Sequence, residues 1–103
     1  MSPATSWLTF QIGGQMHALE AAPVRQILQA PELLALPLAP CLPQCAGLLA
    51  WQGRPLLVLD LGACLLRRSS LAAGDARFVV WSQGSQAGVL AVDGVNGLLR
   101  LSP

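Results

Sequence analysis

Residues 47–61 read GLLAWQGRPLLVLDL and contain two apolar runs, 48–51 and 56–59. Gln52-Gly53 stands between the runs, and glycine adopts the positive φ of a tight turn without steric cost. The pattern therefore predicts a β-hairpin. The second run is apolar at every position, so we expect its strand to be buried on both faces. Pro55 stands at the start of that strand, where a missing amide is tolerated.

The next residues, 60–68, read DLGACLLRR and predict one short helix. Asp60 is a favourable N-cap, and the two arginines that follow the helix favour the negative end of its dipole. The helical period places three side chains on one apolar stripe: Leu61, Cys64 and Leu65. Capping accounts for Asp60 fully, and no second carboxylate is near it in the sequence, so a catalytic role is not needed to explain it.

Near the N-terminus, residues 7–20 predict a second hairpin. Leu8, Phe10 and Ile12 alternate with polar residues, which is the period of a half-buried strand. Gly13-Gly14 is a two-residue turn signal. Pairing across this turn sets Phe10 opposite His17, so we interpret His17 as an aromatic packing residue that faces the core, not as a ligand or base.

The other segments are assigned from the same signals. Residues 23–29, PVRQILQ, predict a short amphipathic helix because Pro23 suits a first helical position and Val24, Ile27 and Leu28 have helical spacing. Residues 31–45 are rich in Pro and Leu and predict an extended segment with turns. Two further strands, 77–82 and 87–92, predict a hairpin around Gly84, and residues 96–101 predict a final strand.

Composition limits the classes of function. The chain has 103 residues, of which 53% are hydrophobic and only 11% charged, and its net charge is +1. Nucleic-acid binding is not expected, because the only basic run is Arg67-Arg68. Residues 33–53 carry no charge, but this stretch contains Pro37, Pro40 and Pro43, which would break a membrane helix. No secretory signal is visible, so a cytoplasmic location is expected. So few charges on a soluble chain suggest that a partner covers some of its surface.

Three cysteines do not make a disulfide framework, and in the cytoplasm they are most simply reduced thiols. Cys41 and Cys45 have C-x₃-C spacing, but a zinc site usually needs four ligands and the single histidine is distant in sequence. We therefore expect no metal and no cofactor. The chain contains no nucleophile elbow, P-loop, H-E-x-x-H or G-x-G-x-x-G motif. A thiol–imidazole pair of Cys45 or Cys64 with His17 is the remaining enzyme hypothesis.

The central stretch resembles the signature of CheW-like domains, the coupling modules of bacterial chemotaxis-type signalling. That signature runs G-V-x-N-L-R-G-x-x-x-P-V-x-D-L, and five of its positions match here: Gly47, Gly53, Val58, Asp60 and Leu61. Among the positions that differ from it are Ala50, Trp51, Gln52 and Leu57. Residues 24–27 are similar to the family's V-x-E-I segment with Gln26 in place of the acid. A second element, G-x-x-V-D-x-V, matches at Val92, Asp93 and Val95, and Gly88 stands one residue earlier than the glycine of the pattern.

The resemblance implies a mainly β fold of two small SH3- or OB-like barrels with one or two short helices. It covers residues 1–103 as a single domain, which corresponds to about the first two-thirds of a family domain. We therefore expect an incomplete second barrel with unpaired edges. A second copy of the chain or another protein is expected to complete it.

By the same resemblance, the chain is expected to be a non-catalytic adaptor. It would couple the cytoplasmic tip of a chemoreceptor to the regulatory domain of a CheA-type histidine kinase by protein–protein binding. The alternative is a degenerate CheW-like barrel that binds another protein or itself. Trp51 fits either a binding anchor or core packing. The partner-binding positions that the family pattern suggests are Val24, Ile27, Gly47, Trp51, Gln52 and Arg54.

Overall fold

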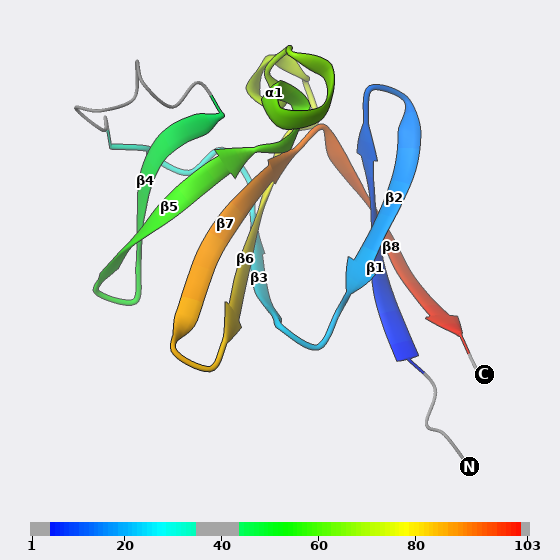
Figure 1. Ribbon diagram of the computed structural model, residues 1–103, viewed down its shortest axis with the longest axis horizontal. Coiled ribbons are helices and arrows are strands. Elements are labelled where there is room, and N and C mark those ends of the chain that lie inside the picture. The colour runs from blue at the N-terminus through cyan, green and yellow to red at the C-terminus, as the bar shows by residue number, and fades with distance from the viewer. Residues whose placement is uncertain (1–4, 35–43, 102–103) are drawn as a thin grey trace.

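The computed structural model describes residues 5–34 and 44–101. It contains eight strands in two sheets, one α-helix and one 3₁₀ turn (Figure 1). The strands are β1 (Thr5–Ile12), β2 (Gln15–Glu20), β3 (Val24–Leu28), β4 (Cys45–Trp51), β5 (Arg54–Asp60), β6 (Arg77–Gln83), β7 (Gln86–Val92) and β8 (Gly94–Leu101). The helix α1 spans Leu61–Leu66, and the 3₁₀ turn η2 spans Ser70–Ala72. The predicted mainly β fold is therefore confirmed.

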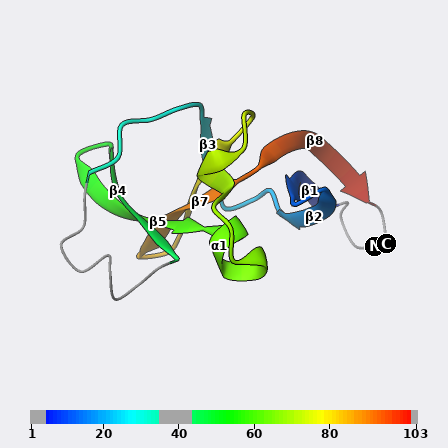
Figure 2. The same ribbon diagram turned by 90° about the horizontal axis from the view of Figure 1, so that it is seen from above.

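The two sheets lie at opposite ends of the molecule (Figure 2). One has three strands in the order β2-β1-β8, and the other has five in the order β3-β6-β7-β5-β4. β5 and β7 pair in parallel, and the other strands pair antiparallel. The chain passes between the sheets at two points, from β2 to β3 and from β7 to β8.

The five-stranded sheet curls around its own core, and its two edge strands are tied together. Leu34, which follows β3, exchanges two backbone hydrogen bonds with Leu48 of β4, at 2.8 and 2.9 Å. The core of this sheet consists of Leu49, Leu56, Val58, Phe78, Val80, Val89 and Ala91. A second core lies between the sheets and consists of Leu8, Phe10, Ile12, Val79 and Val92.

Each edge strand of the three-stranded sheet has a hydrogen-bonded neighbour on one side only. In the described part of the chain, neither β2 nor β8 has a neighbour beyond β1. This open sheet agrees with the expectation of an incomplete second barrel.

All three predicted hairpins are present with the expected turns. Gly13-Gly14 and Gln52-Gly53 each have positive φ at both residues, the conformation of a type I′ turn whose twist matches that of the flanking strands. Phe10 pairs with His17 as predicted, and their rings stack with centroids 5.7 Å apart. Gly84 forms the turn between β6 and β7, where Gln83 pairs with Gln86.

The predicted helix at residues 23–29 is wrong, because residues 24–28 form β3. This strand pairs with β6 through Gln26, Ile27 and Leu28, with an irregularity after Val24. The segment has only five residues, and a helix that short is marginal without tertiary support. Val24 and Ile27 are β-branched, and pairing along β6 satisfies the backbone groups that the helix would have satisfied internally.

Two further predictions are wrong in part. In β5, Leu56 and Val58 are buried, but Leu57 on the other face is 47% exposed, because the sheet packs on its core by one face only. In α1, Leu61 of the predicted apolar stripe packs against the core between the sheets, but Cys64 and Leu65 are exposed, and the buried residue is Gly62. A Cβ at Gly62 would lie 2.7 Å from the Ser70 amide nitrogen, so this glycine allows the close approach of η2.

Asp60 is the N-cap of α1, as predicted, with its carboxylate accepting a hydrogen bond from the Ala63 amide. The helix ends at Leu66 because Arg67 adopts the left-handed conformation, with a φ of 59°. Cys41 and the prolines at 37, 40 and 43 lie outside the described residues, so the extended-segment prediction is tested only at its ends. In the part of the chain that is described, no helix is long and apolar enough to cross a membrane.

Candidate partner-binding site

A groove lies between the two sheets, where β3 faces β8. Its volume is about 390 Å³. It is lined by Leu8, Ala21, Val24, Arg25, Gln26, Ile27, Val95, Gly97 and Leu98. We call this feature the inter-sheet groove.

The floor of the inter-sheet groove is part of the core between the sheets. Leu8 is 3% exposed, and Val24 and Val95 pack half-buried against the same cluster. Its walls carry exposed aliphatic side chains, with Ile27 39% and Leu98 71% exposed. Apolar side chains this accessible on both sides of a concave surface are typical of a site that binds a protein segment.

Arg25 supplies the one charge among the lining residues. Its guanidinium donates to the Ser82 carbonyl at 3.1 Å and to the Ala22 carbonyl at 3.4 Å. These bonds hold the charge at the edge of the groove. The groove therefore suits an apolar segment that carries an acidic or polar acceptor group near one end.

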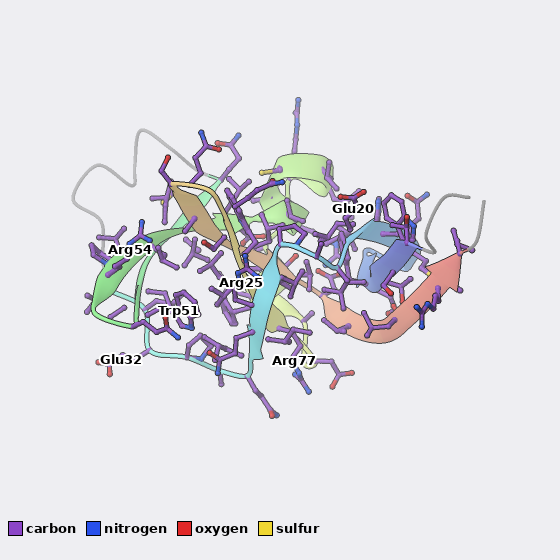
Figure 3. All side chains as sticks on the ribbon, turned by 90° about the horizontal axis from the view of Figure 1, so that it is seen from below. Glu20, Arg25, Glu32, Trp51, Arg54 and Arg77 are labelled. Atoms are coloured by element: carbon purple, nitrogen blue, oxygen red, sulfur yellow. The ribbon has the colours of Figure 1, made fainter. Side chains whose placement is uncertain are left out.

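The site residues predicted from sequence fall into two groups. Val24 and Ile27 come together in the inter-sheet groove. Trp51, Gln52 and Arg54 lie at the β4–β5 turn, which we call the hairpin tip. Figure 3 shows Trp51 and Arg54 at one end of the molecule and Arg25 nearer the middle.

One hydrogen bond joins the two groups. The Trp51 indole nitrogen donates to the Gln26 side-chain oxygen at 2.8 Å, and Gln26 also lines the groove. Trp51 is half-buried and packs against the core of the five-stranded sheet, so it contributes to the core and to this contact at once. Sequence reasoning singled out both residues but gave no signal that they meet.

Gly47, another of the predicted partner-binding positions, is buried. Its φ is +129°, and a Cβ would lie 2.5 Å from the Leu34 carbonyl oxygen. Its role here is to let β4 approach the segment after β3. Gln52 and Arg54 are exposed, and Gln52 has a φ of 49°, which fits a turn position but is strained for a residue with a side chain.

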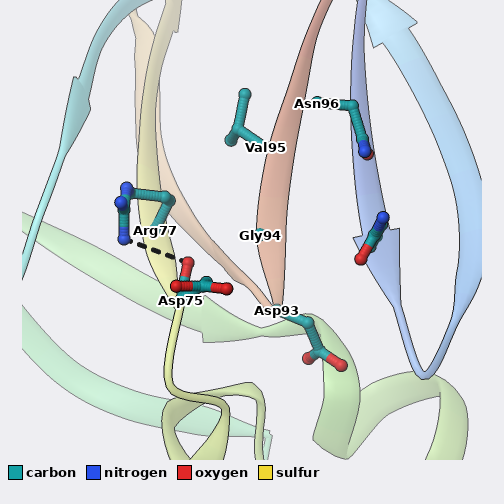
Figure 4. Close-up of a pocket in the computed structure, with 7 residues that line it drawn as sticks. Asp75, Arg77, Asp93, Gly94, Val95 and Asn96 are labelled. Carbon is teal, nitrogen blue, oxygen red and sulfur yellow. Dashed lines mark hydrogen bonds between the residues drawn. The ribbon is translucent and has the colours of Figure 1, made fainter.

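A smaller polar pocket lies near the point where the chain leaves β7 for β8 (Figure 4). It has a volume of about 280 Å³ and is lined by Gln11, Asp75, Arg77, Asp93, Gly94, Val95 and Asn96. Arg77 donates to the backbone carbonyl oxygen of Asp75 at 3.0 Å. Asp93 accepts from the Gly13 amide at 2.8 Å and from Arg68 at 3.2 Å. Both of these hydrogen bonds reach Asp93 Oδ2, whereas Asp93 Oδ1 is buried without a hydrogen-bond partner among the described residues.

The imidazole and the thiol that the enzyme hypothesis would pair make other contacts in the structure. His17 stacks on Phe10. Desolvation and the nearby Asp60 carboxylate raise the pKa of the Cys64 thiol above its usual value, which favours the unreactive thiol at neutral pH. Within residues 5–34 and 44–101, no three His, Cys, Asp or Glu side chains are grouped as a metal site requires.

Comparisons with known proteins agree with the resemblance seen in the sequence. The model of the CheW-like domain matches residues 6–103. The fold is similar to the crystal structure of the scaffolding protein TtCheW from Thermoanaerobacter tengcongensis, with a TM-score of 0.81 and 18% sequence identity. The match covers 94% of this chain and 65% of that protein. A search of curated proteins finds no match. Because the family model spans nearly every residue, the chain belongs to the CheW-like domain family.

Proposed function

We propose that this chain is a non-catalytic adaptor in a chemotaxis-type signalling pathway. It would join the cytoplasmic tip of a chemoreceptor to the regulatory domain of a CheA-type histidine kinase. The observation that supports this most is the inter-sheet groove, which is apolar, open and lined by Val24 and Ile27. Family membership supports the same function, and the structural neighbour is named as a scaffolding protein.

In this proposal, the receptor segment is an amphipathic helix that places its apolar face in the groove. Helix-in-groove recognition uses a few aliphatic anchors, and Ile27 and Leu98 on the two walls are suited to contact them. The side-chain oxygen of Gln26 accepts a hydrogen bond from the Trp51 indole, so the amide hydrogens of Gln26 are free to donate to the partner. No residue of the groove needs to change its protonation state, so binding alone is the mechanism.

A kinase domain would need a surface separate from the groove. Leu57 is exposed on the face of the five-stranded sheet that points away from its core, and it provides an apolar contact there. The hairpin tip, with Gln52 and Arg54, adjoins this face because β5 begins at Arg54. One partner in the groove and another on this face would allow both to bind at once.

The test is a pair of binding titrations, one with a receptor-tip coiled coil and one with a CheA-type regulatory domain. Ile27→Glu buries a charge in the groove and should weaken receptor binding at least tenfold, since an unpaired buried charge is costly. Leu65→Glu is the matched control, because Leu65 is 55% exposed on α1, which does not line the groove. Leu57→Glu should weaken kinase binding and leave receptor binding unchanged.

If the unmodified chain binds neither partner, the adaptor function is wrong. If it binds the receptor tip and Ile27→Glu binds equally well, the groove is not the site. Circular dichroism of each variant checks that the loss is not a loss of folding.

A further inference from the structure

Two neighbouring residues of β3, Arg25 and Gln26, bring polar groups to the inter-sheet groove. In a regular strand, neighbouring side chains point to opposite faces of the sheet. Here the pairing of β3 with β6 shifts by one residue between Val24 and Gln26, so Arg25 is an extra residue in the strand. Such a bulge changes the direction of side chains, and both Arg25 and Gln26 line the groove. We call these two residues the polar pair.

Trp51 determines which end of the Gln26 amide remains available. The indole N–H is only a donor, so it can bond to the side-chain oxygen of Gln26 but not to its NH₂ group. This hydrogen bond is 2.8 Å long. The indole ring is itself held in place, because it is half-buried and packs against the core of the five-stranded sheet. The oxygen of Gln26 is therefore occupied, and the side chain offers its N–H groups to a ligand.

Arg25 adds a positive charge and further donors. Of its five N–H groups, two donate to the carbonyls of Ala22 and Ser82, and three remain. All five acidic residues of the chain lie in the described ranges, where the only ion pair joins Arg68 to Asp93. Arg25 thus has no acidic partner, and none of the described residues that line the groove is acidic. The polar pair therefore consists of donors and carries one uncompensated positive charge.

We propose that the inter-sheet groove selects a helical segment with a carboxylate beside its apolar stripe, and that Trp51 is the positioning residue that makes Gln26 a donor for this carboxylate. The inference rests on the proposed function, since it concerns the same groove. A carboxylate has two oxygens that can accept from a guanidinium and an amide together. A cationic side chain at the same place would face the like charge of Arg25, which is unfavourable.

The residues that set this preference all belong to one sheet. Arg25 and Gln26 lie on β3 and Trp51 on β4, and both strands are part of the five-stranded sheet. The preference for a carboxylate therefore does not depend on the edges of the three-stranded sheet.

Three synthetic peptides test the preference. Each is an amphipathic helix with one stripe of leucines and the same hydrocarbon staple on its polar face, and Glu, Gln or Lys flanks the stripe at both ends. The symmetric placement makes the result independent of the direction in which the helix lies. Calorimetric titration of the 103-residue protein should show the Glu peptide binding about tenfold more tightly than the Gln peptide, and the Lys peptide most weakly. Equal affinities for the three peptides, or no binding of the Glu peptide, would overturn the proposal.

Trp51→Phe tests the positioning role, because it keeps a packed ring and removes the indole N–H. The Gln26 amide can then turn, so the ratio of the affinities for the Glu and Gln peptides should fall about threefold or more. Lost packing alone would weaken both peptides alike and leave this ratio unchanged, which would contradict the role of Trp51. Trp81→Phe is the matched control, because Trp81 does not line the groove and its indole nitrogen makes no hydrogen bond within the described chain. It should leave the ratio unchanged.

Gln26→Glu provides a second test at an exposed position that should tolerate substitution. It keeps an acceptor for the Trp51 indole but replaces the two amide hydrogens with a negative charge, so the preference for the Glu peptide over the Lys peptide should be lost. A variant that still prefers the Glu peptide as strongly as the parent does would show that Gln26 does not read the carboxylate.

The outcomes for this inference and for the adaptor function are separable. A protein that prefers the Glu peptide but binds no receptor tip keeps the groove chemistry and loses the adaptor function. A protein that binds the receptor tip but does not distinguish the three peptides keeps the adaptor function and loses the inference.

Discussion

Asp60 connects three segments through one carboxylate. Its Oδ1 accepts from the amides of Ala63, at 3.1 Å, and Ser70, at 2.9 Å. Its Oδ2 accepts from the Ser69 hydroxyl at 2.5 Å. The capping of α1 could be predicted from the sequence, since an acid directly before a short apolar-periodic segment is a known start signal. The contacts with Ser69 and Ser70 could not, because they depend on how the chain folds back after the helix.

Two substitutions at Asp60 should therefore distinguish the contribution of its hydrogen bonds to stability from the contribution of its charge. Asp60→Ala removes both acceptor oxygens with their three hydrogen bonds and leaves the buried Ser70 amide without a partner, so it should lower the free energy of unfolding by about 3 kcal/mol. Asp60→Asn keeps an oxygen for both amides, and its NH₂ can donate to Ser69. We expect it to cost about 1 kcal/mol or less in urea titrations. Equal losses in the two variants would show that charge, not hydrogen bonding, is what matters here.

At the scale of elements, the turns and the hairpins that they close were predictable, and pairing between strands distant in sequence was not. Gly13-Gly14, Gln52-Gly53 and Gly84 each mark a turn by local backbone preference, so the three hairpins follow from short stretches of sequence. The sequence of β3 predicts a helix although the strand is stabilised by β6, whose paired residues lie 50 to 57 positions later in the chain, and no local pattern records that contact. The exposed face of β5 was missed for a similar reason, since a run that is apolar at every position does not show which side faces the core.

The glycines of β4 and its surroundings give a graded test of the packing between elements. Gly47→Ala combines a φ of +129° with a Cβ placed 2.5 Å from a backbone oxygen, so it should cost about 3 kcal/mol or more. Gly53→Ala has a φ of +77° but open space, and about 1 kcal/mol is expected. Gly74→Ala has neither constraint and should lie within about 0.5 kcal/mol of the parent. A Gly47→Ala protein as stable as the Gly74→Ala protein would contradict the close approach of β4 to Leu34.

At the scale of the whole molecule, Asp93 stands where the chain passes from the five-stranded sheet to the three-stranded sheet. Burial raises the pKa of this carboxyl, but the hydrogen bond from the Gly13 amide and the charge and hydrogen bond of Arg68 outweigh it, so the net pKa lies below its usual value. Its carboxylate joins β8 to the β1–β2 turn and to the segment after α1. The family pattern marked Asp93 in the sequence, but not the three segments that it brings together.

The sign of the pH effect follows from this lowered pKa. The folded pKa is below the unfolded one, so the carboxylate stabilises the fold fully above the unfolded value of about 4 and loses this contribution as pH falls through the folded value. The difference in free energy of unfolding between the parent and Asp93→Asn should therefore be largest above about pH 4 and shrink at lower pH. Urea titrations at several pH values measure it. A difference that grew on acidification would mean that Asp93 is destabilised by its surroundings.

The pairing of β1 with β8 also determines the order in which the two sheets can form. Thr9 donates its hydroxyl to the carbonyl of Gly97, which is 88 residues later in the chain. The entropy cost of loop closure grows with separation, and contacts this distant form slowly. During synthesis on a ribosome, β1 and β2 emerge first and must wait for β8 before their sheet exists. The three-stranded sheet is therefore completed only after every strand of the five-stranded sheet has left the ribosome.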